Sequence, residues 1–341
     1  MKPIKTAILG YGRSGSSLHA DPIQALPDFD LVAVCDSEPA ALKKAKDRFN
    51  CKTYNNYADM LKEEIDLVVI VTRSHQHSQM ACDCLNAGKN VLVTKPWALN
   101  EREALNMINA SEKSGRMLLP WLPARFAEDL TELKEIVASG IIGKIFMIRR
   151  SNFTIGVRND WQTEKRCGGG YLLNWGPHLV DQPILLANEP VKNVYAVMKQ
   201  VINPGDGEDV FFAVMNTENV TIISEFNYGA SVIPDWVVQG DRGTITVKGN
   251  EVEVHAAGYP EKLDQAAYSS KVEVKITSGK KGRISSKNKY GDAELIYGRI
   301  AKAIRGTEPY PVTTGAALTL TRTLDAIRKS AETGAVVIPA K

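Results

Sequence analysis

The chain has few of the residues that build metal centres or disulfide frameworks. Its 341 residues include only five cysteines and five histidines. An odd, scattered set of cysteines does not indicate a disulfide framework in a chain of this size. Cys82 and Cys84 lie on a predicted helix, where residues two apart point to different faces, and His75 and His77 have no further ligands at matching spacing. We therefore expect no metal site.

The chain also lacks long apolar runs and an excess of charge of one sign. Its apolar stretches, such as residues 67–71, are far shorter than the roughly 20 residues that span a bilayer, so we expect no membrane segment. The start of the chain has no signal-peptide pattern, and a cytoplasmic location is expected. The net charge of +3 does not favour nucleic-acid binding. Residues 279–289 hold five basic residues and no acidic one; we interpret them as a solvated loop, with an anionic ligand or partner as the alternative.

What the first part of the chain does have is a regular alternation of apolar runs and helical segments. Continuous runs of valine, isoleucine and leucine are typical of parallel strands buried on both faces. Ser37 and Asn100 are predicted to cap two of the helices, and Gly115 to end the second. The pattern predicts a doubly wound parallel sheet. Strands are expected at residues 6–9, 31–35, 67–71, 90–93 and 117–119, and helices at residues 39–49, 79–86 and 100–114.

The rhythm changes after residue 123. Helices are predicted at residues 128–139 and 172–186, and six strand-like segments then follow one another between residues 191 and 254. No helix of ordinary length fits between most of them, which favours an α+β domain with a largely antiparallel sheet. Helices return at residues 293–303 and 316–331.

A glycine motif follows the first predicted strand. Gly10, Gly12 and Gly15 have the G-x-G-x-x-G spacing, which allows a tight turn, a close approach of a pyrophosphate and helix–strand packing. Asp36 ends the second strand, 21 residues after Gly15, where a carboxylate can accept hydrogen bonds from ribose hydroxyls. The combination predicts a dinucleotide site that includes Arg13 and Ser14. The Asp36 carboxylate repels a 2′-phosphate, so NAD is favoured over NADP, although Arg13 and Lys43 could supply positive charge.

Later motifs give the chain a specific resemblance to the Gfo/Idh/MocA oxidoreductases, from about residue 6 to about residue 339. The first segment follows the third strand, and the second contains three consecutive glycines. The residues that match are Thr72, His77, Ala87, Gly88, Lys89, Val91, Lys95 and Pro96 in the first segment, and Gly168, Gly169, Gly170, Leu172, Gly176, His178 and Asp181 in the second.

The resemblance implies an architecture and an activity. It implies a Rossmann domain, predicted at residues 1–122, and an α/β domain with a large open sheet, predicted at residues 123–341 for substrate binding and oligomerisation. It implies NAD(P)-dependent oxidation or reduction of sugars, polyols and related hydroxy compounds, with sheet faces that pair into dimers or tetramers. His178 would be the base and Lys95 the residue that polarises the substrate oxygen; Thr72, His77 and Lys95 would also contact the cofactor.

Two positions depart from the pattern of that family. Thr94 and Asn174 stand where the family has a glutamate and an aspartate. Asn174 can hydrogen-bond a hydroxyl or orient the histidine ring, but it supplies no negative charge, so the pKa of His178 would be raised less.

Asp181 is the alternative carboxylate, and Trp161, Arg166, Asn174 and Asp181 are candidates for substrate contact. Because Thr94 and Asn174 are changes that could accompany loss of catalysis, a catalytically inert dinucleotide-binding regulator remains the alternative to an enzyme.

Overall fold

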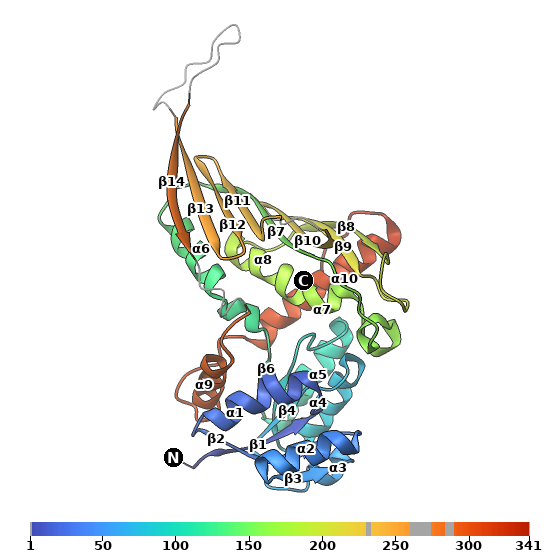
Figure 1. Ribbon diagram of the computed structural model, residues 1–341. Coiled ribbons are helices and arrows are strands. Elements are labelled where there is room, and N and C mark those ends of the chain that lie inside the picture. Colours follow the sequence, from blue (N-terminus) through green and yellow to red (C-terminus); the bar gives the residue numbers. More distant parts are fainter. Residues whose placement is uncertain (1, 230–232, 260–273, 284–289, 341) are drawn as a thin grey trace.

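The computed structural model describes residues 2–229, 233–259, 274–283 and 290–340, which form two sheets and their helices (Figure 1). The first sheet is parallel throughout, in the order β3-β2-β1-β4-β5-β6, which confirms the predicted doubly wound sheet. Its strands are β1 (Ile4–Leu9), β2 (Phe29–Cys35), β3 (Lys52–Tyr54), β4 (Leu67–Ile70), β5 (Asn90–Val93) and β6 (Leu118–Pro120). The short strand β3 was not predicted.

The helices of this half pack against both faces of the parallel sheet, and their ends largely follow the sequence. Asn100 accepts a hydrogen bond from the Glu103 N–H, and Gly115 ends the helix with a φ of 63°, as predicted. The predicted cap at Ser37 is wrong, because the N-cap position of α2 falls on Glu38 and no side chain caps this helix. The helices are η1 (Gly15–His19), α1 (Ala20–Ala25), α2 (Pro39–Phe49), α3 (Tyr57–Met60), η2 (Ser74–Gln76), α4 (His77–Asn86) and α5 (Glu101–Ser114).

The second sheet has the order β14-β13-β12-β11-β7-β10-β9-β8, and only the pair β7–β10 is parallel. The predicted mostly antiparallel sheet is therefore confirmed, although β7 and β14 were missed. Residues 279–283 of the basic run belong to β14 instead of a loop, and its residues 284–289 lie outside the described residues. The strands are β7 (Ile145–Thr154), β8 (Asn193–Lys199), β9 (Val210–Asn216), β10 (Thr221–Tyr228), β11 (Trp236–Gly240), β12 (Gly243–Lys248), β13 (Glu251–Gly258) and β14 (Lys275–Arg283).

Helices cover one face of this second sheet, the face turned toward the first sheet (Figure 1). The helix predicted at residues 172–186 is divided at Val180. Pro183 has no N–H to donate to the Leu179 carbonyl, which accepts a hydrogen bond from Ser224 Oγ instead. The helices after β6 are η3 (Pro123–Phe126), α6 (Glu128–Ala138), η4 (Trp161–Thr163), η5 (Lys165–Cys167), α7 (Tyr171–Leu179), α8 (Asp181–Ala187) and α10 (Thr314–Thr333).

One late helix returns to the first half of the molecule. Helix α9 (Ala293–Ile304) lies beside α1, and its Tyr297 is fully buried. The Tyr297 ring packs on Phe29 and Trp121, and its hydroxyl is 2.8 Å from Nδ1 of His19. The boundary at residues 122 and 123 stays a prediction.

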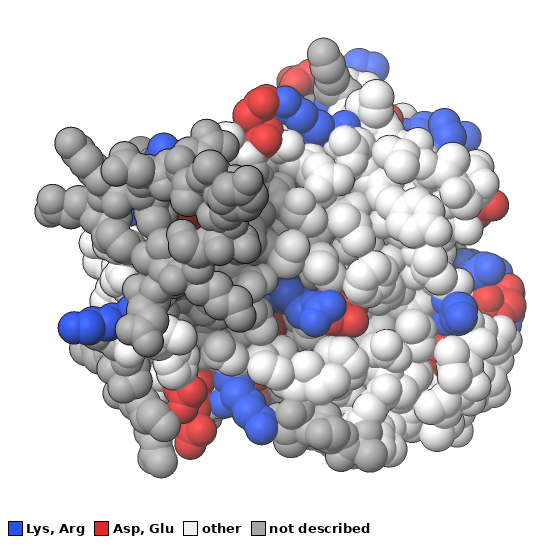
Figure 2. Space-filling model, turned by 90° about the horizontal axis from the view of Figure 1, so that it is seen from above, with Lys and Arg blue, Asp and Glu red and all other residues white. Residues whose placement is uncertain are grey.

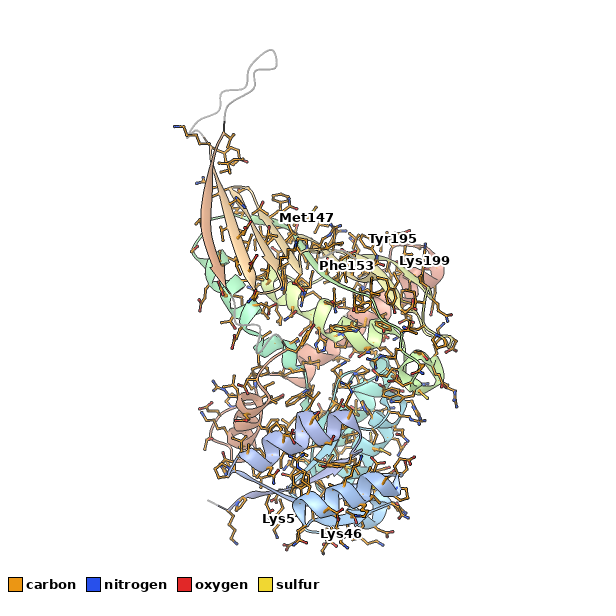
Figure 3. All side chains as sticks on the ribbon, in the orientation of Figure 1. Lys5, Lys46, Met147, Phe153, Tyr195 and Lys199 are labelled. Atoms are coloured by element: carbon orange, nitrogen blue, oxygen red, sulfur yellow. The ribbon has the colours of Figure 1, made fainter. Side chains whose placement is uncertain are left out.

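On the other face of the second sheet no helix of the described residues packs, and this face is rich in uncharged side chains (Figure 2). Met147, Phe153 and Tyr195 project from it, away from the helices (Figure 3). Val214 lies opposite Tyr195 across strands β8 and β9, and Tyr195 is 42% exposed. We call this surface the open sheet face.

None of the described helices is both long and apolar enough to cross a bilayer.

Candidate active site

The glycine loop follows β1 directly, and its geometry requires glycine. Gly10 has a φ of 92°, and a Cβ there would lie 2.8 Å from the main chain of Val71. A Cβ on Gly15 would lie 2.0 Å from the carbonyl oxygen of Gly10. At Gly12 a Cβ would meet nothing within 4 Å, so this side of the loop is open to a ligand. These are the three requirements of a pyrophosphate-binding turn.

Asp36, the residue predicted to bind the ribose hydroxyls, lies beside this loop. Asp36 is half-buried at the end of β2. Its carboxylate accepts hydrogen bonds from the N–H groups of Tyr11, at 2.6 Å, and Glu38, at 2.9 Å. These two donors fix the carboxylate next to the glycine loop, and each oxygen keeps a further lone pair for a ribose hydroxyl.

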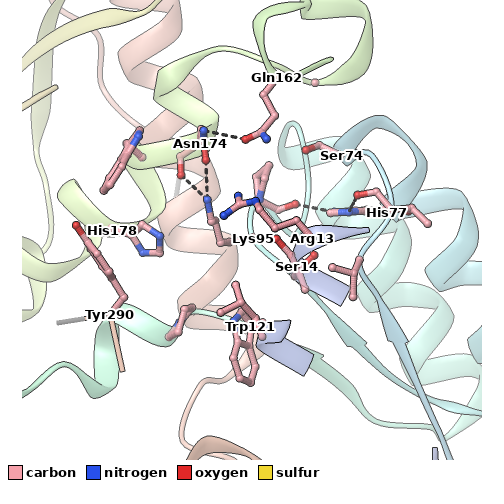
Figure 4. Close-up of a pocket in the computed structure, with 18 of the residues that line it drawn as sticks. Arg13, Ser14, Ser74, His77, Lys95, Trp121, Gln162, Asn174, His178 and Tyr290 are labelled. Atoms are coloured by element: carbon pink, nitrogen blue, oxygen red, sulfur yellow. Dashed lines mark hydrogen bonds between the residues drawn. The ribbon is translucent and has the colours of Figure 1, made fainter. Parts of the chain in front are cut away.

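A cavity of about 420 Å³ opens between the two halves, at the carboxyl ends of the parallel strands (Figure 4). This is the edge at which open α/β sheets bind ligands. Residues from both halves line it, so the site needs the whole chain. The predicted site residues among the lining are Arg13, Ser14, Thr72, His77, Lys95, Trp161, Asn174 and His178.

Lys95 and Asn174 join the two halves at the centre of this cavity (Figure 4). The Lys95 ammonium donates to the main-chain oxygen of Asn174 at 2.8 Å and to its Oδ1 at 2.7 Å. Asn174 Nδ2 donates to Oε1 of Gln162, which fixes the orientation of the amide. An ammonium group has three N–H donors, so one remains for a ligand oxygen. Burial, with the positive charges of Arg158 and Arg13, lowers the pKa of Lys95 to about 8.

His178 lies one helical turn beyond Asn174 on α7 and lines the same cavity. No hydrogen bond joins its ring to another described residue, and its buried Nδ1 has no partner among them. Burial lowers the pKa of His178 well below its usual value, and the positive charges of Lys95 and Arg150 lower it further. The ring is therefore neutral at pH 7 and able to accept a proton.

Both ring nitrogens of His77 face main-chain carbonyl oxygens, unlike those of His178. Its Nδ1 lies 2.8 Å from the Pro96 carbonyl oxygen, and its Nε2 lies 3.1 Å from that of Thr72. Burial lowers the pKa of His77, so the ring is neutral and donates one N–H at a time. His77 thus ties the segment after β4 to the Lys95–Pro96 segment within the cavity lining, and so helps to position Lys95.

The structure does not bring two of the substrate-contact candidates to the cavity. Arg166 is 80% exposed and pairs with Glu164. Asp181 turns away from His178 because the chain bends at Val180, and both of its oxygens bind the Arg125 guanidinium at 2.7 Å. Asp181 is therefore not available as the replacement carboxylate.

Sequence reasoning missed other residues of the cavity. Trp121 directly follows β6, so the rule that ligands bind at the carboxyl ends of parallel strands could have found it. Arg158 and Tyr290 come from loops of the second half and Gln162 comes from the short helix η4, with no local pattern that marks them. Tyr290 stacks beside His178, with ring centroids 5.5 Å apart. Nowhere in the described ranges do three or more His, Cys, Asp or Glu residues gather as metal ligands.

Comparisons with known proteins match both halves of the chain to one family. Residues 4–120 match the model of an oxidoreductase family with an NAD-binding Rossmann fold, and residues 134–338 match the C-terminal α/β domain of the same family. An uncharacterised oxidoreductase of Schizosaccharomyces pombe is 28% identical over 76% of each chain. The scyllo-inositol 2-dehydrogenase (NADP(+)) of Bacillus subtilis is 24% identical over 96% of this chain and 94% of its own.

Among solved structures, an NAD-binding protein from Listeria innocua has a TM-score of 0.83 at 24% identity, covering 99% of this chain and 97% of that one. This likeness concerns the fold. The family matches together span both sheets and the cavity between them, and the chain belongs to the Gfo/Idh/MocA oxidoreductase family, with an NAD-binding Rossmann domain at its amino-terminal end.

Proposed function

We propose that this protein is an oxidoreductase that transfers a hydride between a nicotinamide cofactor and a hydroxyl-bearing carbon of a sugar, a polyol or a related compound. The observation that carries the proposal is the neutral ring of His178, which no described residue hydrogen-bonds, in the same cavity as the Lys95 ammonium. Oxidation of an alcohol needs a base for the hydroxyl proton and a positive charge for the developing alkoxide.

The chain's own residues divide this work. The glycine loop and Asp36 would hold the dinucleotide, whose nicotinamide ring supplies the hydride acceptor. Lys95 would use its remaining N–H to bind the substrate oxygen, and Asn174 would keep the ammonium in place. His178 would take the proton as the C–H bond breaks, and the Lys95 charge that lowers its pKa would favour returning that proton in the reducing direction.

A binding assay followed by a turnover screen tests the proposal. Quenching of NADH fluorescence would measure cofactor binding, and a panel of sugars, polyols and keto-sugars would then be screened for turnover. The proposal expects both binding and turnover. Cofactor binding without turnover of any compound would instead support the inert regulator that Thr94 and Asn174 keep open.

We further propose that NAD is preferred over NADP, because Asp36 places a negative charge where a 2′-phosphate would lie. NAD should bind at least about tenfold more tightly, a difference of about 1.4 kcal/mol. Asp36→Ala should narrow this gap by weakening NAD binding and admitting NADP, as measured by titration with each cofactor. Equal or tighter NADP binding by the unmodified protein would contradict the preference.

We also propose that the open sheet face pairs with a second copy of the chain, giving a dimer or a tetramer. Its exposed apolar side chains, among them Tyr195 and Val197 on β8, favour burial in an interface. Light scattering at tens of micromolar should show an oligomer, and Val214→Lys should shift it toward the monomer. Leu105→Lys, on the exposed side of α5, is the matched control and should leave the oligomeric state unchanged. A strict monomer would refute the pairing.

A further inference from the structure

The charge of the cavity is unbalanced. Arg13, Lys95 and Arg158 line it, and none of the lining residues in the described part of the chain is aspartate or glutamate. The histidines that line the cavity do not contribute to its net charge. Burial lowers the pKa of His19 to about 3, that of His178 well below its usual value, and that of His77 below its usual value, so all three rings are neutral.

These positive charges have little compensation from the protein. The two acceptors that Lys95 has are oxygens of Asn174, which is uncharged. Arg158 has one carboxylate nearby, Asp160, at 3.3 Å, and this carboxylate is half-exposed and also accepts hydrogen bonds from Gln162. Exposed pairs of this kind contribute little. Arg158 also acts on Lys95. Burial lowers the pKa of Lys95, and the positive charge of Arg158 lowers it further.

The main chain offers no alternative anion site in the glycine patch of the second half. The N–H groups of Gly168, Gly169 and Gly170 all donate to main-chain oxygens, those of Lys165, Glu164 and Gln162. An anion at this end of the cavity would therefore meet the charged side chains of Lys95 and Arg158 instead of free glycine N–H groups.

The cofactor would offset only part of this charge. Arg13 belongs to the glycine loop, next to the place of the pyrophosphate, so a bound dinucleotide would balance Arg13 and leave Lys95 and Arg158. Arg158 has further guanidinium N–H groups that no described residue occupies, in a planar fork that matches carboxylate and phosphate oxygens.

We propose that the substrate carries an oxyanion, either a carboxylate or a phosphate group, which Arg158 binds close to Lys95 while the reacting hydroxyl faces His178. The inference rests on the proposed oxidoreductase function and narrows its substrate class to sugar acids or sugar phosphates. The missing negative charge of the cavity is then brought in by the substrate.

Matched triplets of probes test the inference. Each triplet contains a neutral hexose, its uronate and its 6-phosphate, for example D-glucose, D-glucuronate and D-glucose 6-phosphate. Binding to the NAD-loaded protein is measured by calorimetry at constant ionic strength, and turnover by NADH absorbance. In at least one triplet, an anionic member should bind at least about tenfold more tightly than the neutral hexose. Whether the uronate or the phosphate binds more tightly identifies the anion.

Two variants make the test specific. Arg158→Gln should reduce the tenfold preference to less than about threefold without changing NAD affinity. Arg102→Gln removes an exposed arginine on α5, outside the cavity lining, and should leave the preference intact. Asn174→Asp returns a carboxylate to Lys95 and should weaken binding of the anionic probes.

The outcomes separate this inference from the proposed function. Turnover of neutral hexoses, with no preference for the anionic members, would overturn the inference and leave the oxidoreductase function standing. An Arg158-dependent preference in binding, without any turnover, would support the anion site and overturn the enzymatic function. Failure of every anionic probe to bind, or a preference that survives Arg158→Gln, would also overturn the inference.

Discussion

His178→Ala is expected to lower turnover by a factor of about 10² to 10⁴, the usual effect of losing a general acid or base. NAD affinity should barely change, because the glycine loop lies on a different element. His178→Gln should be about as slow, since an amide fills the space but accepts no proton. His255→Ala is the matched control, because that histidine is exposed on β13 and lies outside the cavity lining. Near-full turnover of His178→Ala would refute the assignment and make Tyr290 the next residue to test.

The pH dependence of kcat/KM gives this prediction a second readout. In the oxidising direction, His178 must be neutral and Lys95 protonated. Activity should therefore fall only at pH values well below 6.5 on the acid side, and it should fall above about pH 8, where Lys95 loses its proton. Asn174→Asp places an anion beside both groups, so both limbs of the profile should move to higher pH. An alkaline limb unchanged in Asn174→Asp would contradict the role given to Lys95.

The second large effect is on stability. Arg125→Met should destabilise the fold by about 3–5 kcal/mol, because it leaves the carboxylate of Asp181 buried without its partner. Burial already raises the pKa of Asp181, against the opposing charge of Arg125. Without Arg125 this pKa would rise further, and the loss of stability should be smaller near pH 5, where the carboxyl can take up a proton. Urea unfolding at two pH values measures both effects.

A double variant controls for the pair. Arg125→Met combined with Asp181→Leu should recover much of the lost stability, because no charge is then left buried. Turnover per folded molecule should survive in the double variant, since Asp181 does not line the cavity. A specific loss of turnover at unchanged stability would return Asp181 to the list of substrate contacts.

The fold could be predicted wherever apolar periodicity dominates the sequence. Continuous apolar runs marked five of the six strands of the parallel sheet, and a succession of short strand-like segments marked six strands of the second sheet. Strand β7 was missed because its middle is polar, with Arg149, Arg150, Ser151 and Asn152 in succession. Arg150 is nevertheless fully buried, where its guanidinium stacks on Trp236 and donates to Gln182. Such a strand is stabilised by partners distant in sequence, which no local pattern reveals.

The site could be predicted where its residues belong to compact motifs. Asn174 and His178 are four residues apart on one helix, so their shared face follows from the sequence. The placement of Asp181 did not follow, because Pro183 breaks the helix between it and His178 and redirects the carboxylate to Arg125. Arg158 and Tyr290 reach the cavity through long-range packing, and their sequence neighbours give no sign of it.

The return of α9 to the first half has a consequence for biosynthesis. Tyr297 covers Phe29 and Trp121, yet it is translated long after both of them. At 5–20 residues per second, the nascent chain waits roughly 10 to 40 s between residue 120 and the end of α9. During that interval the newly made parallel sheet exposes an apolar surface on the ribosome, which chaperones would bind. A ribosome that stops before residue 293 would release an amino-terminal half that lacks this cover and is exposed to aggregation.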